Sequence, residues 1–303
     1  MAESPELIHS AAVERSAKTQ WHHLLGRLLE LLLTPVGITV QTELQVMSEP
    51  PKVDILLLRR KGAVWTPAQA RLLPDGVQHS RARHILLEFK FTESVNRAAL
   101  TQALAYDYFY RQTQQVAEAD VQTFVISAHT VRKNVLAEYG YAVTEHPGVY
   151  RSSNPLLRTV PLLLLNELQA TQHNAFIQCF ASKRRVRTHA FQLLAQLDWQ
   201  MVNEAFWDFV AGLRNYLEVK GAEMSNVTLP SGLTPEMVME TGKAMRKALL
   251  ENLTPQEIQQ LLTKLTPEQR LAGLTPEEGQ RLLEQLQVYL QTQQPKRSSS
   301  TEN

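Results

Sequence analysis

Apolar residues recur at every third or fourth position between Ser16 and Leu33, which places them on one face of a predicted helix that Thr34-Pro35 ends. Apolar and polar residues then alternate from Ile38 to Val46, the pattern of a strand with one buried face. Two short apolar runs, Val53–Leu58 and His84–Phe91, predict further strands. The first part of the chain is therefore expected to hold one helix followed by three strands that form a meander.

Helices and strands alternate in the next part of the chain. Periodicity predicts, in order, a helix over Asn96–Gln114 opened by Glu93-Ser94, a strand over Val121–Ser127, a helix over Val131–Tyr139, and strands over Gly148–Arg151 and Thr159–Leu165. Residues 63–83 contain several turn formers and predict a long excursion between two strands. Strands mixed with helices indicate an α/β fold, in which helices cover both faces of a sheet. A helical apolar stripe follows from Thr188 to Leu217.

The carboxyl-terminal part of the chain repeats one short unit. Leu-Thr-Pro followed by Glu or Gln occurs at Leu233, Leu253, Leu265 and Leu274. Threonine is a favourable helix cap and proline is favourable at the first helical position, so each unit predicts the start of a short helix. The second and fourth units also have a glutamate three residues after the threonine, which predicts a capping box at Thr254–Glu257 and at Thr275–Glu278.

Charge and cysteine content exclude several classes of protein. The chain has 31 Lys and Arg against 30 Asp and Glu, and the net charge of +1 excludes a uniformly basic nucleic-acid coat but not a local basic patch. Cys179 is the single cysteine, which excludes an intramolecular disulfide framework and a cysteine-rich zinc site. The first residues are acidic where an export signal would be basic, and no apolar stretch approaches the roughly 20 residues of a membrane-spanning helix. We expect a cytoplasmic protein with no membrane partner.

Three charged residues stand in strands that are otherwise apolar. Asp54 lies at the start of Val53–Leu58, while Glu88 and Lys90 lie two residues apart in the next strand and so point to the same face. An acid and a lysine are costly to bury unless they are paired. Asp54 and Glu88 could share Mg²⁺, which takes one or two carboxylates together with waters. Lys90 would then donate to a phosphate oxygen or orient the attacking water, so these residues predict metal-assisted hydrolysis of a phosphodiester.

Two polar residues of the following helix belong to the same candidate site. Gln102 and Tyr106 are four residues apart, which places both side chains on one face of the helix Asn96–Gln114. From there they could flank Lys90 and the substrate backbone. The alternative is that they are ordinary surface and core residues of the helix.

Asp54 followed by Glu88-Phe89-Lys90 on consecutive strands resembles the motif of the PD-(D/E)XK nuclease superfamily, and Gln102 with Tyr106 is similar to the additional motif of its RecB-type members. More narrowly, the chain resembles the Rpn group of recombination-promoting, transposase-like nucleases, whose carboxyl-terminal repeats look like the Leu-Thr-Pro-Glu units. The resemblance covers Ser16–Leu165, about half of the chain, and the tail Leu233–Leu290. Two departures are that Pro51 is not adjacent to the aspartate and that the excursion before Glu88 is long.

The resemblance implies a restriction-endonuclease-like mixed β-sheet flanked by helices, followed by a helical carboxyl-terminal extension. It also implies DNA cleavage that depends on Mg²⁺, with Mn²⁺ as an alternative ion. Asp54 and Glu88 would bind the metal, Phe89 would add its backbone carbonyl, and Lys90 would be the catalytic lysine.

Many members of the superfamily have a further glutamate ahead of the aspartate. Glu30 and Glu43 both qualify as this additional metal ligand by position, and Glu30 is preferred because the first helix is the usual source. The alternative for Glu30 is a charged interruption of a leucine-rich helix. Asp54 could instead cap its strand, and Glu88 and Lys90 could form an ion pair that faces solvent.

Basic residues provide candidate contacts to DNA at two places. Arg59 and Arg60 follow the strand that contains Asp54, and Lys183, Arg184 and Arg185 precede the helical stripe. The alternative for both groups is an ordinary solvated charged surface.

These expectations divide the chain into a nuclease core over residues 1–187, a helical extension over 188–220, a linker over 221–232, short helices with the Leu-Thr-Pro-Glu repeats over 233–290, and a disordered tail over 291–303. The expected function is a DNA endonuclease in recombination, DNA mobility or defence, whose carboxyl-terminal helices dock on the core or on another copy of the chain. The alternative is a catalytically inactive module with a nuclease fold that binds nucleic acid or a protein partner.

Overall fold

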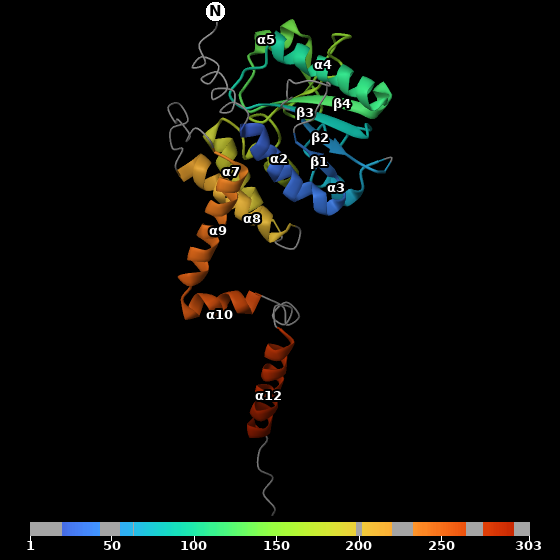
Figure 1. Cartoon of the computed structure of the whole chain (residues 1–303). Coiled ribbons are helices and arrows are strands. Elements are labelled where there is room, and N and C mark those ends of the chain that lie inside the picture. Colours follow the sequence, from blue (N-terminus) through green and yellow to red (C-terminus); the bar gives the residue numbers. More distant parts are fainter. Residues whose placement is uncertain are drawn as a thin grey trace, which may run out of the picture. The chain divides into compact units, whose positions relative to one another are not determined.

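The computed structural model describes residues 20–42, 55–62, 64–197, 202–219, 233–264 and 275–293 (Figure 1). These residues form a mixed seven-stranded sheet flanked by helices, with further helices at the carboxyl-terminal end, which confirms the α/β class. The strands are β1 Thr39–Gln41, β2 Ile55–Arg59, β3 His84–Lys90, β4 Val121–Ser127, β5 Tyr141–Val143, β6 Val149–Ser152 and β7 Leu162–Leu164.

Among the described residues as far as Val219, helices lie before, between and after these strands. They are α2 Gln20–Leu33, α3 Pro67–Ala70, α4 Arg97–Gln114, α5 Lys133–Glu138, α6 Gln172–Gln178, α7 Arg184–Leu194 and α8 Glu204–Arg214, with the single turns η1 Thr34–Val36, η2 Glu118–Asp120 and η4 Asn215–Val219. Three helices follow in the repeat region: α9 Pro235–Glu251, α10 Pro255–Lys264 and α12 Pro276–Gln293.

The sheet combines antiparallel and parallel pairing in the order β1-β2-β3-β4-β7-β6-β5. β1, β2 and β3 form the predicted antiparallel meander, whereas β3, β4 and β7 run parallel to one another. The carboxyl ends of these three parallel strands therefore meet at the same edge of the sheet. β3 lies between β2 and β4, in a register that pairs Glu88 with Ile55 and Lys90 with Ser127.

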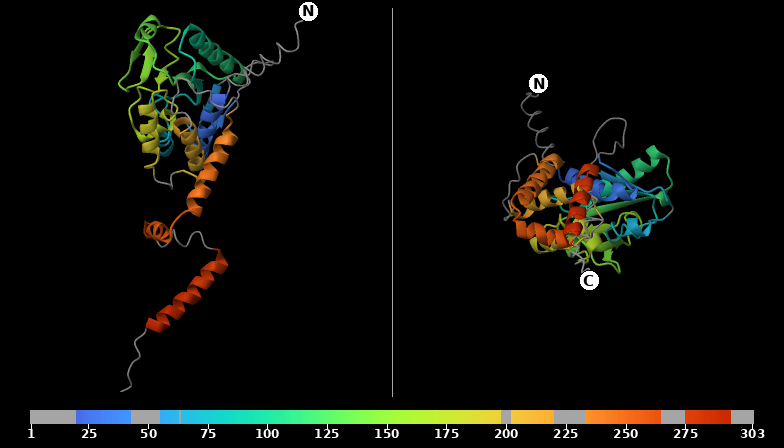
Figure 2. Two further views of the ribbon diagram at one scale, coloured as in Figure 1. Left: turned by 90° about the vertical axis from the view of Figure 1, so that its left-hand side faces the viewer. Right: turned by 90° about the horizontal axis from the view of Figure 1, so that it is seen from below.

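Helices cover both faces of the sheet (Figures 1 and 2). Because side chains alternate along a strand, each strand contributes to two cores. Leu57, Leu86 and Val125 face α4 and α5 on one side. Leu87 and Phe124 point to the other side, into a larger core with α2, α6, α7 and α8. This double coverage explains why β3 is an almost continuous apolar run rather than an alternating one.

Most of the predicted elements are confirmed, with changes at their ends. β4 has the predicted bounds and β3 ends one residue earlier than expected. The predicted start of α4 at Glu93-Ser94 is wrong, because Asn96 caps this helix by accepting a hydrogen bond of 2.9 Å from the backbone N–H of Ala99. β1 and β2 confirm parts of the two strands predicted over Ile38–Val46 and Val53–Leu58. The rest of these two strands falls within residues 43–54, which lie outside the described part of the chain.

Several elements were not predicted. β5 and α6 were missed, and the excursion over residues 63–83 contains α3. The single helical stripe over Thr188–Leu217 is two helices, because α7 ends at Leu194 and Asn203 caps the separate helix α8. α7 begins at Arg184 rather than at Thr188, so the basic run forms its first turn.

The repeat units start helices as predicted. α9, α10 and α12 each begin at the proline of a Leu-Thr-Pro unit, and both predicted capping boxes are present as hydrogen bonds between Thr254 and Glu257 and between Thr275 and Glu278. The unit at Leu265 lies outside the described residues. α12 extends to Gln293, so the first residues of the expected disordered tail are helical.

The chain divides into two compact units, residues 1–246 and residues 247–303. Within the first unit, α8 and α9 approach so closely that a Cβ on Gly212 would overlap the carbonyl oxygen of Val238, and a Cβ on Gly242 would overlap that of Asp208. Arg246 of α9 also binds both carboxylate oxygens of Asp208, at 2.8 and 3.2 Å. In the part of the chain that the structure describes, no helix is both long and apolar enough to span a membrane.

Candidate active site

Glu88 and Lys90 lie on β3 and point to the face of the sheet that α4 covers. Their exposed fractions are 0% and 8%, so the charges are withdrawn from solvent. The Lys90 Nζ atom lies 2.7 Å from Glu88 Oε1, which makes the two an ion pair buried in the centre of the sheet. The alternative of a solvent-facing pair on an edge strand is excluded, because β2 and β4 flank β3 on its two sides.

α4 brings Gln102 and Tyr106 to the same place. Lys90 Nζ donates to Gln102 Oε1 at 3.3 Å, and Gln102 Nε2 in turn donates to the hydroxyl oxygen of Tyr106. Four of the predicted site residues, which we call the Glu88 cluster (Glu88, Lys90, Gln102 and Tyr106), are thus joined by direct polar contacts.

The position of α4 over β3 has a local cause. Asn96 fixes the first turn of the helix, and Asp107 fixes its middle by accepting a hydrogen bond of 2.9 Å from Thr123 on β4. Arg111 pairs with the other oxygen of Asp107 at 2.7 Å, so this buried carboxylate is fully engaged. Asn96 therefore sets where α4 begins, and Asp107 attaches its middle to β4, with Gln102 and Tyr106 between these two positions.

Glu93 is a member of the site that the sequence reasoning missed. Its carboxylate lies 3.4 Å from Lys90 Nζ, although its side chain is 55% exposed. The signal for this role was its position three residues after Lys90, directly beyond the strand. It was instead interpreted as the opening of the helix, and Asn96 serves that purpose.

Lys90 remains a cation in this environment. Burial on its own would lower the pKa of the Lys90 ammonium, but the carboxylates of Glu88 and Glu93 outweigh that effect and hold the pKa above its usual value. Lys90 can therefore act as a fixed positive charge and hydrogen-bond donor, the arrangement that stabilises developing negative charge on a phosphate oxygen.

The other predicted metal ligands are distributed as follows. Asp54 and Glu43 lie outside the described residues, although Asp54 directly precedes β2, whose first residue pairs with Glu88. Glu30 lies exposed on α2 and pairs with Arg27 at 2.6 Å. Phe89 directs its side chain into the core on the opposite face of the sheet.

The described residues contain no group of three or more His, Cys, Asp or Glu side chains that could hold a metal ion. Mg²⁺ can be bound by fewer protein ligands than three, since one or two carboxylates together with waters suffice. Glu88 supplies one such carboxylate, and Asp54 is the residue predicted from the sequence to supply a second. The described residues therefore fit an Mg²⁺ ion that is bound by one or two carboxylates and otherwise by waters.

The two groups of predicted DNA-binding residues lie at opposite edges of the sheet. Arg59 pairs with His84 at the amino end of β3, and Arg60 is only 6% exposed, with its guanidinium over the ring of Trp65 at 4.8 Å. By contrast, Lys183, Arg184 and Arg185 are exposed and line a cavity of about 910 Å³.

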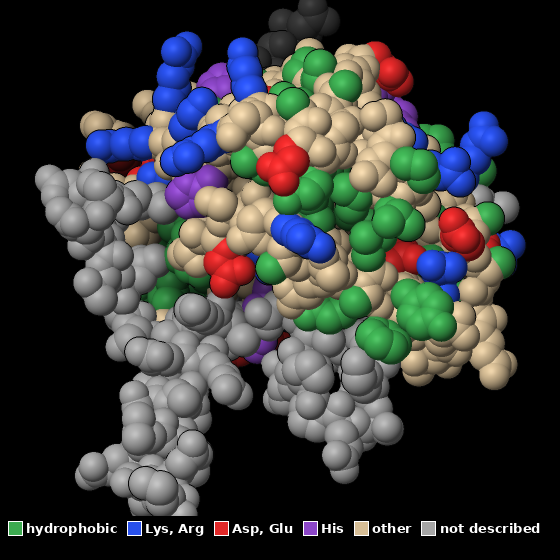
Figure 3. Space-filling view, turned by 90° about the horizontal axis from the view of Figure 1, so that it is seen from above, with side chains coloured by type: hydrophobic (Ala, Val, Ile, Leu, Met, Phe, Trp, Pro, Cys, Tyr) green, Lys and Arg blue, Asp and Glu red, His purple; other side chains and the backbone are tan. Residues whose placement is uncertain are grey.

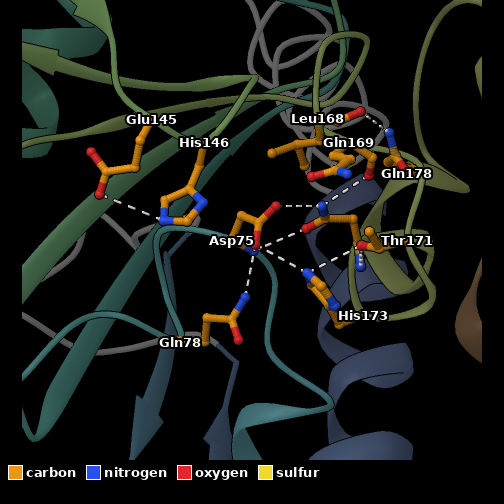
Figure 4. A network of polar contacts seen from close by, with 10 residues as sticks. Asp75, Gln78, Glu145, His146, Leu168, Gln169, Thr171, His173 and Gln178 are labelled. Carbon is orange, nitrogen blue, oxygen red and sulfur yellow. Dashed lines mark hydrogen bonds and ion pairs between the residues drawn. The ribbon is translucent and has the colours of Figure 1, made fainter.

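A second polar network surrounds the buried carboxylate of Asp75 (Figure 4). Asp75 accepts hydrogen bonds from Asn174 Nδ2 at 2.7 Å, from Gln78 Nε2 at 2.8 Å and from His173 Nε2 at 3.0 Å. Burial on its own raises the pKa of Asp75, but these hydrogen bonds outweigh it and hold the pKa below its usual value.

The Asp75 network does not have the geometry of a catalytic triad. In a triad the carboxylate and the nucleophile contact opposite nitrogens of the histidine ring. Here Asp75 and the Thr171 hydroxyl both contact Nε2 of His173, at 3.0 and 3.1 Å. Thr171 also caps α6, so the network anchors the loop at Asp75 to the start of that helix.

The fold and the site together define an α/β protein with a buried acid–lysine pair on a central strand of a mixed sheet. Comparison of the chain with models of protein families, with curated proteins and with solved structures gives no match.

Proposed function

We propose that the protein is a metal-dependent DNA endonuclease of the PD-(D/E)XK type, with a restriction-endonuclease-like core, acting in recombination, DNA mobility or defence. The observation that carries the proposal is the Glu88 cluster, in which two charged residues of one central strand are buried together with two polar residues of the next helix. Burying charges is costly, and a stable sheet has no need of them at this position.

The connectivity supports the same proposal. A helix, three antiparallel strands, a second helix and a strand parallel to the third follow one another in this chain. The resemblance noted in the sequence requires the aspartate and the Glu-x-Lys pair on consecutive strands of such a sheet, and Glu88 and Lys90 stand at the carboxyl end of the third strand.

Each residue has a separate role in this proposal. Glu88, with Asp54, would bind Mg²⁺, which supplies Lewis acidity toward a phosphodiester and an activated water nucleophile. Lys90 donates to a phosphate oxygen, where its fixed positive charge stabilises the charge that develops in the transition state. Gln102 holds the Lys90 ammonium in place from α4 and is itself positioned by Tyr106, while the carboxylates of Glu88 and Glu93 keep Lys90 protonated.

One observation favours the alternative of a module that binds without catalysis. Glu88 and Lys90 already neutralise each other at 2.7 Å, and such a pair can persist as part of a packed core. A metal ion and a phosphate would have to separate these two partners.

The test is cleavage of supercoiled plasmid by the purified chain, with Mg²⁺ or with EDTA. We expect nicking with Mg²⁺, none with EDTA, and a loss of roughly a hundred-fold or more in rate for Lys90→Ala, the size typical of removing one transition-state donor. Lys247→Ala is the matched control, because Lys247 lies in the other unit with its side chain 77% exposed.

Lys90→Ala leaves Glu88 buried without its main counterion, so the variant could lose activity by unfolding. Lys90→Arg keeps the positive charge beside Glu88 but changes its shape and donor geometry. We expect Lys90→Arg to melt close to the wild-type temperature and still to cleave poorly. Wild-type cleavage rates in both folded variants would refute the site, and a folded wild-type chain that cleaves neither single- nor double-stranded DNA with Mg²⁺ or Mn²⁺ would favour the binding module.

A further inference from the structure

We infer that the cavity lined by Lys183, Arg184 and Arg185 binds the phosphate backbone of a nucleic acid and presents it to the Glu88 cluster. The inference rests on the proposed function in one respect, namely that the bound polyanion is a nucleic acid. It assigns a binding site that is separate from the cleaving residues and formed by α7 and by the segment that joins β7 to it.

The cavity has the composition of an anion site. Its volume of about 910 Å³ is within the range of ligand sites, roughly 300–1,000 Å³. Besides the three cations, it is lined by the imidazole of His189 and by the polar side chains of Asn166 and Gln192, and no carboxylate is among its lining residues in the described part of the chain.

The three cations have no acidic partner among the described residues. Glu218 does approach α7, but it accepts a hydrogen bond from Thr188 and pairs with Arg214 at 3.0 Å. Arg184 also acts unfavourably on the buried Arg187, since it lowers the pKa of that guanidinium together with burial, which is the larger cause. Three unneutralised cations on adjacent residues repel one another, and a bound polyanion would remove that cost.

A chain of hydrogen bonds places the cavity at the same edge of the sheet as Lys90. The backbone N–H of Ala128 donates to the carbonyl oxygen of Lys90 at 3.0 Å. The carbonyl of Ala128 accepts from the N–H of Ser182 and from Asn166 Nδ2, each at 3.0 Å. Asn166 Oδ1 then accepts from the N–H of Lys183 at 3.0 Å.

This edge is where the carboxyl ends of β3, β4 and β7 meet, and open α/β sheets bind their ligands beyond such ends. The other predicted basic pair, Arg59 and Arg60, lies at the opposite end of β3. Of the two predicted basic groups, the cations of the cavity are therefore the ones that lie at the same end of the sheet as Glu88 and Lys90.

The net charge of the chain gives no indication of a local group of cations such as the one in the cavity. On the face shown in Figure 3, several lysine and arginine side chains gather at the upper left, and others lie along the right side among acidic side chains. A protein with a formal charge of +1 can still bind a polyanion when its cations are gathered in this way.

The experiment measures DNA binding in EDTA, where no cleavage occurs, by the full chain and by the double variant Arg184→Gln, Arg185→Gln. The probes are a short fluorescein-labelled duplex and its single strand, and the affinity is followed against salt concentration. Losing two phosphate contacts should reduce the slope of log K against log salt by about 1.8 for the duplex and about 1.4 for the single strand. If the two proteins converge near 1 M salt, the variant binds the duplex about 60-fold more weakly at 0.1 M.

The matched control is Arg71→Gln, Arg81→Gln, which removes the same charge from two exposed arginines elsewhere in the same unit. An equal loss of affinity in this control would overturn the inference, because the effect would then come from net charge. The inference would also be wrong if the cavity variant bound DNA as tightly as the wild type. In that case the proposed function would still hold if Lys90→Ala lost cleavage. A third outcome is possible, in which the wild-type chain does not cleave DNA but binds it, and the cavity variant binds it more weakly. That outcome would support the cavity as a binding site and refute the proposed nuclease activity.

Discussion

At the scale of single residues, the chain uses buried carboxylates in two ways. Glu88 is paired with a lysine, whose charge is then available for chemistry. Asp75 is surrounded by neutral donors from Asn174 and Gln78 and by His173, and these hydrogen bonds join a loop to a helix far along the sequence. In the Glu88–Lys90 pair, a ligand could replace one charged partner of the other. In the Asp75 network, both carboxylate oxygens already accept hydrogen bonds.

The Asp75 network predicts a pH-dependent part of the stability. Because the folded state depresses the pKa of Asp75, its contribution is present above the unfolded value of about 3.9 and is lost as the pH falls through the lower folded value. At pH 7, Asp75→Asn should cost about 1.5–3 kcal/mol, the usual size for hydrogen bonds to a charged group. Urea unfolding between pH 5 and pH 2.5, values set around the unfolded pKa, should show a smaller loss of stability for this variant than for the wild type.

Asp120→Asn serves as the control for the Asp75 experiment, because Asp120 is only partly buried and lies 3.8 Å from Arg83. It should leave the pH dependence nearly unchanged. If Asp75→Asn unfolded with the same pH dependence as the wild type, the network would have no role in acid stability.

At the scale of elements, two glycines let the first part of α9, Pro235 to Arg246, approach α8 within the first unit. At both glycines an added Cβ would meet backbone, which cannot rotate away as a side chain could, and the overlap is larger at Gly242. Gly242→Ala should therefore push the helices apart, weaken the pairing of Arg246 with Asp208, and cost about 1–3 kcal/mol, the size typical of overpacking.

Chemical denaturation and hydrogen exchange over residues 235–246 would measure this effect. Gly279→Ala is the matched control, because nothing lies near the added Cβ in α12 and alanine is the better helix former. Unchanged stability and unchanged exchange in Gly242→Ala would show that the close approach contributes nothing.

The sequence predicted the elements that have strong local signals. The apolar runs of β3 and β4, the period of α4 and the threonine caps of α10 and α12 can each be recognised without knowing the rest of the chain. β5 was missed because it is three residues long and two of its three side chains are exposed, so it carries almost no pattern.

The Glu88 cluster was predictable in part for a related reason. A two-residue spacing on a strand and a four-residue spacing on a helix identify which side chains share a face, and this grouped Glu88 with Lys90 and Gln102 with Tyr106. The participation of Glu93 depends on how the chain turns after β3, and the cavity depends on contacts between β4, β7 and α7. Such long-range contacts leave no periodic signal in the sequence.

At the scale of the whole molecule, the buried apolar clusters that the described residues form all lie in the first unit. Among the described residues they extend no further than Val238, while Ile258, Leu282 and Leu286 of the second unit are exposed. A chain that ends after Leu253 should therefore melt within about 2 °C of the full chain in calorimetry, because it loses no core residue.

The same truncation separates two roles for the carboxyl-terminal helices. Light scattering of both chains would show whether the exposed apolar residues of α10 and α12 join copies of the protein, as one expectation from the sequence holds. A drop of many degrees in the melting temperature of the truncated chain would contradict the independence of the first unit.

All four residues of the Glu88 cluster come from one uninterrupted stretch of the chain, the end of β3 and the first half of α4. The short connection from Phe91 to Asn96 and the hydrogen bond from Thr123 to Asp107 together set the rotation of the helix relative to the sheet. One extra residue in that connection would turn Gln102 by about 100° about the helix axis. Length changes in other loops leave that rotation untouched. In the course of evolution, the segment could therefore be inherited as a single block, while insertions and deletions accumulate in the surrounding loops.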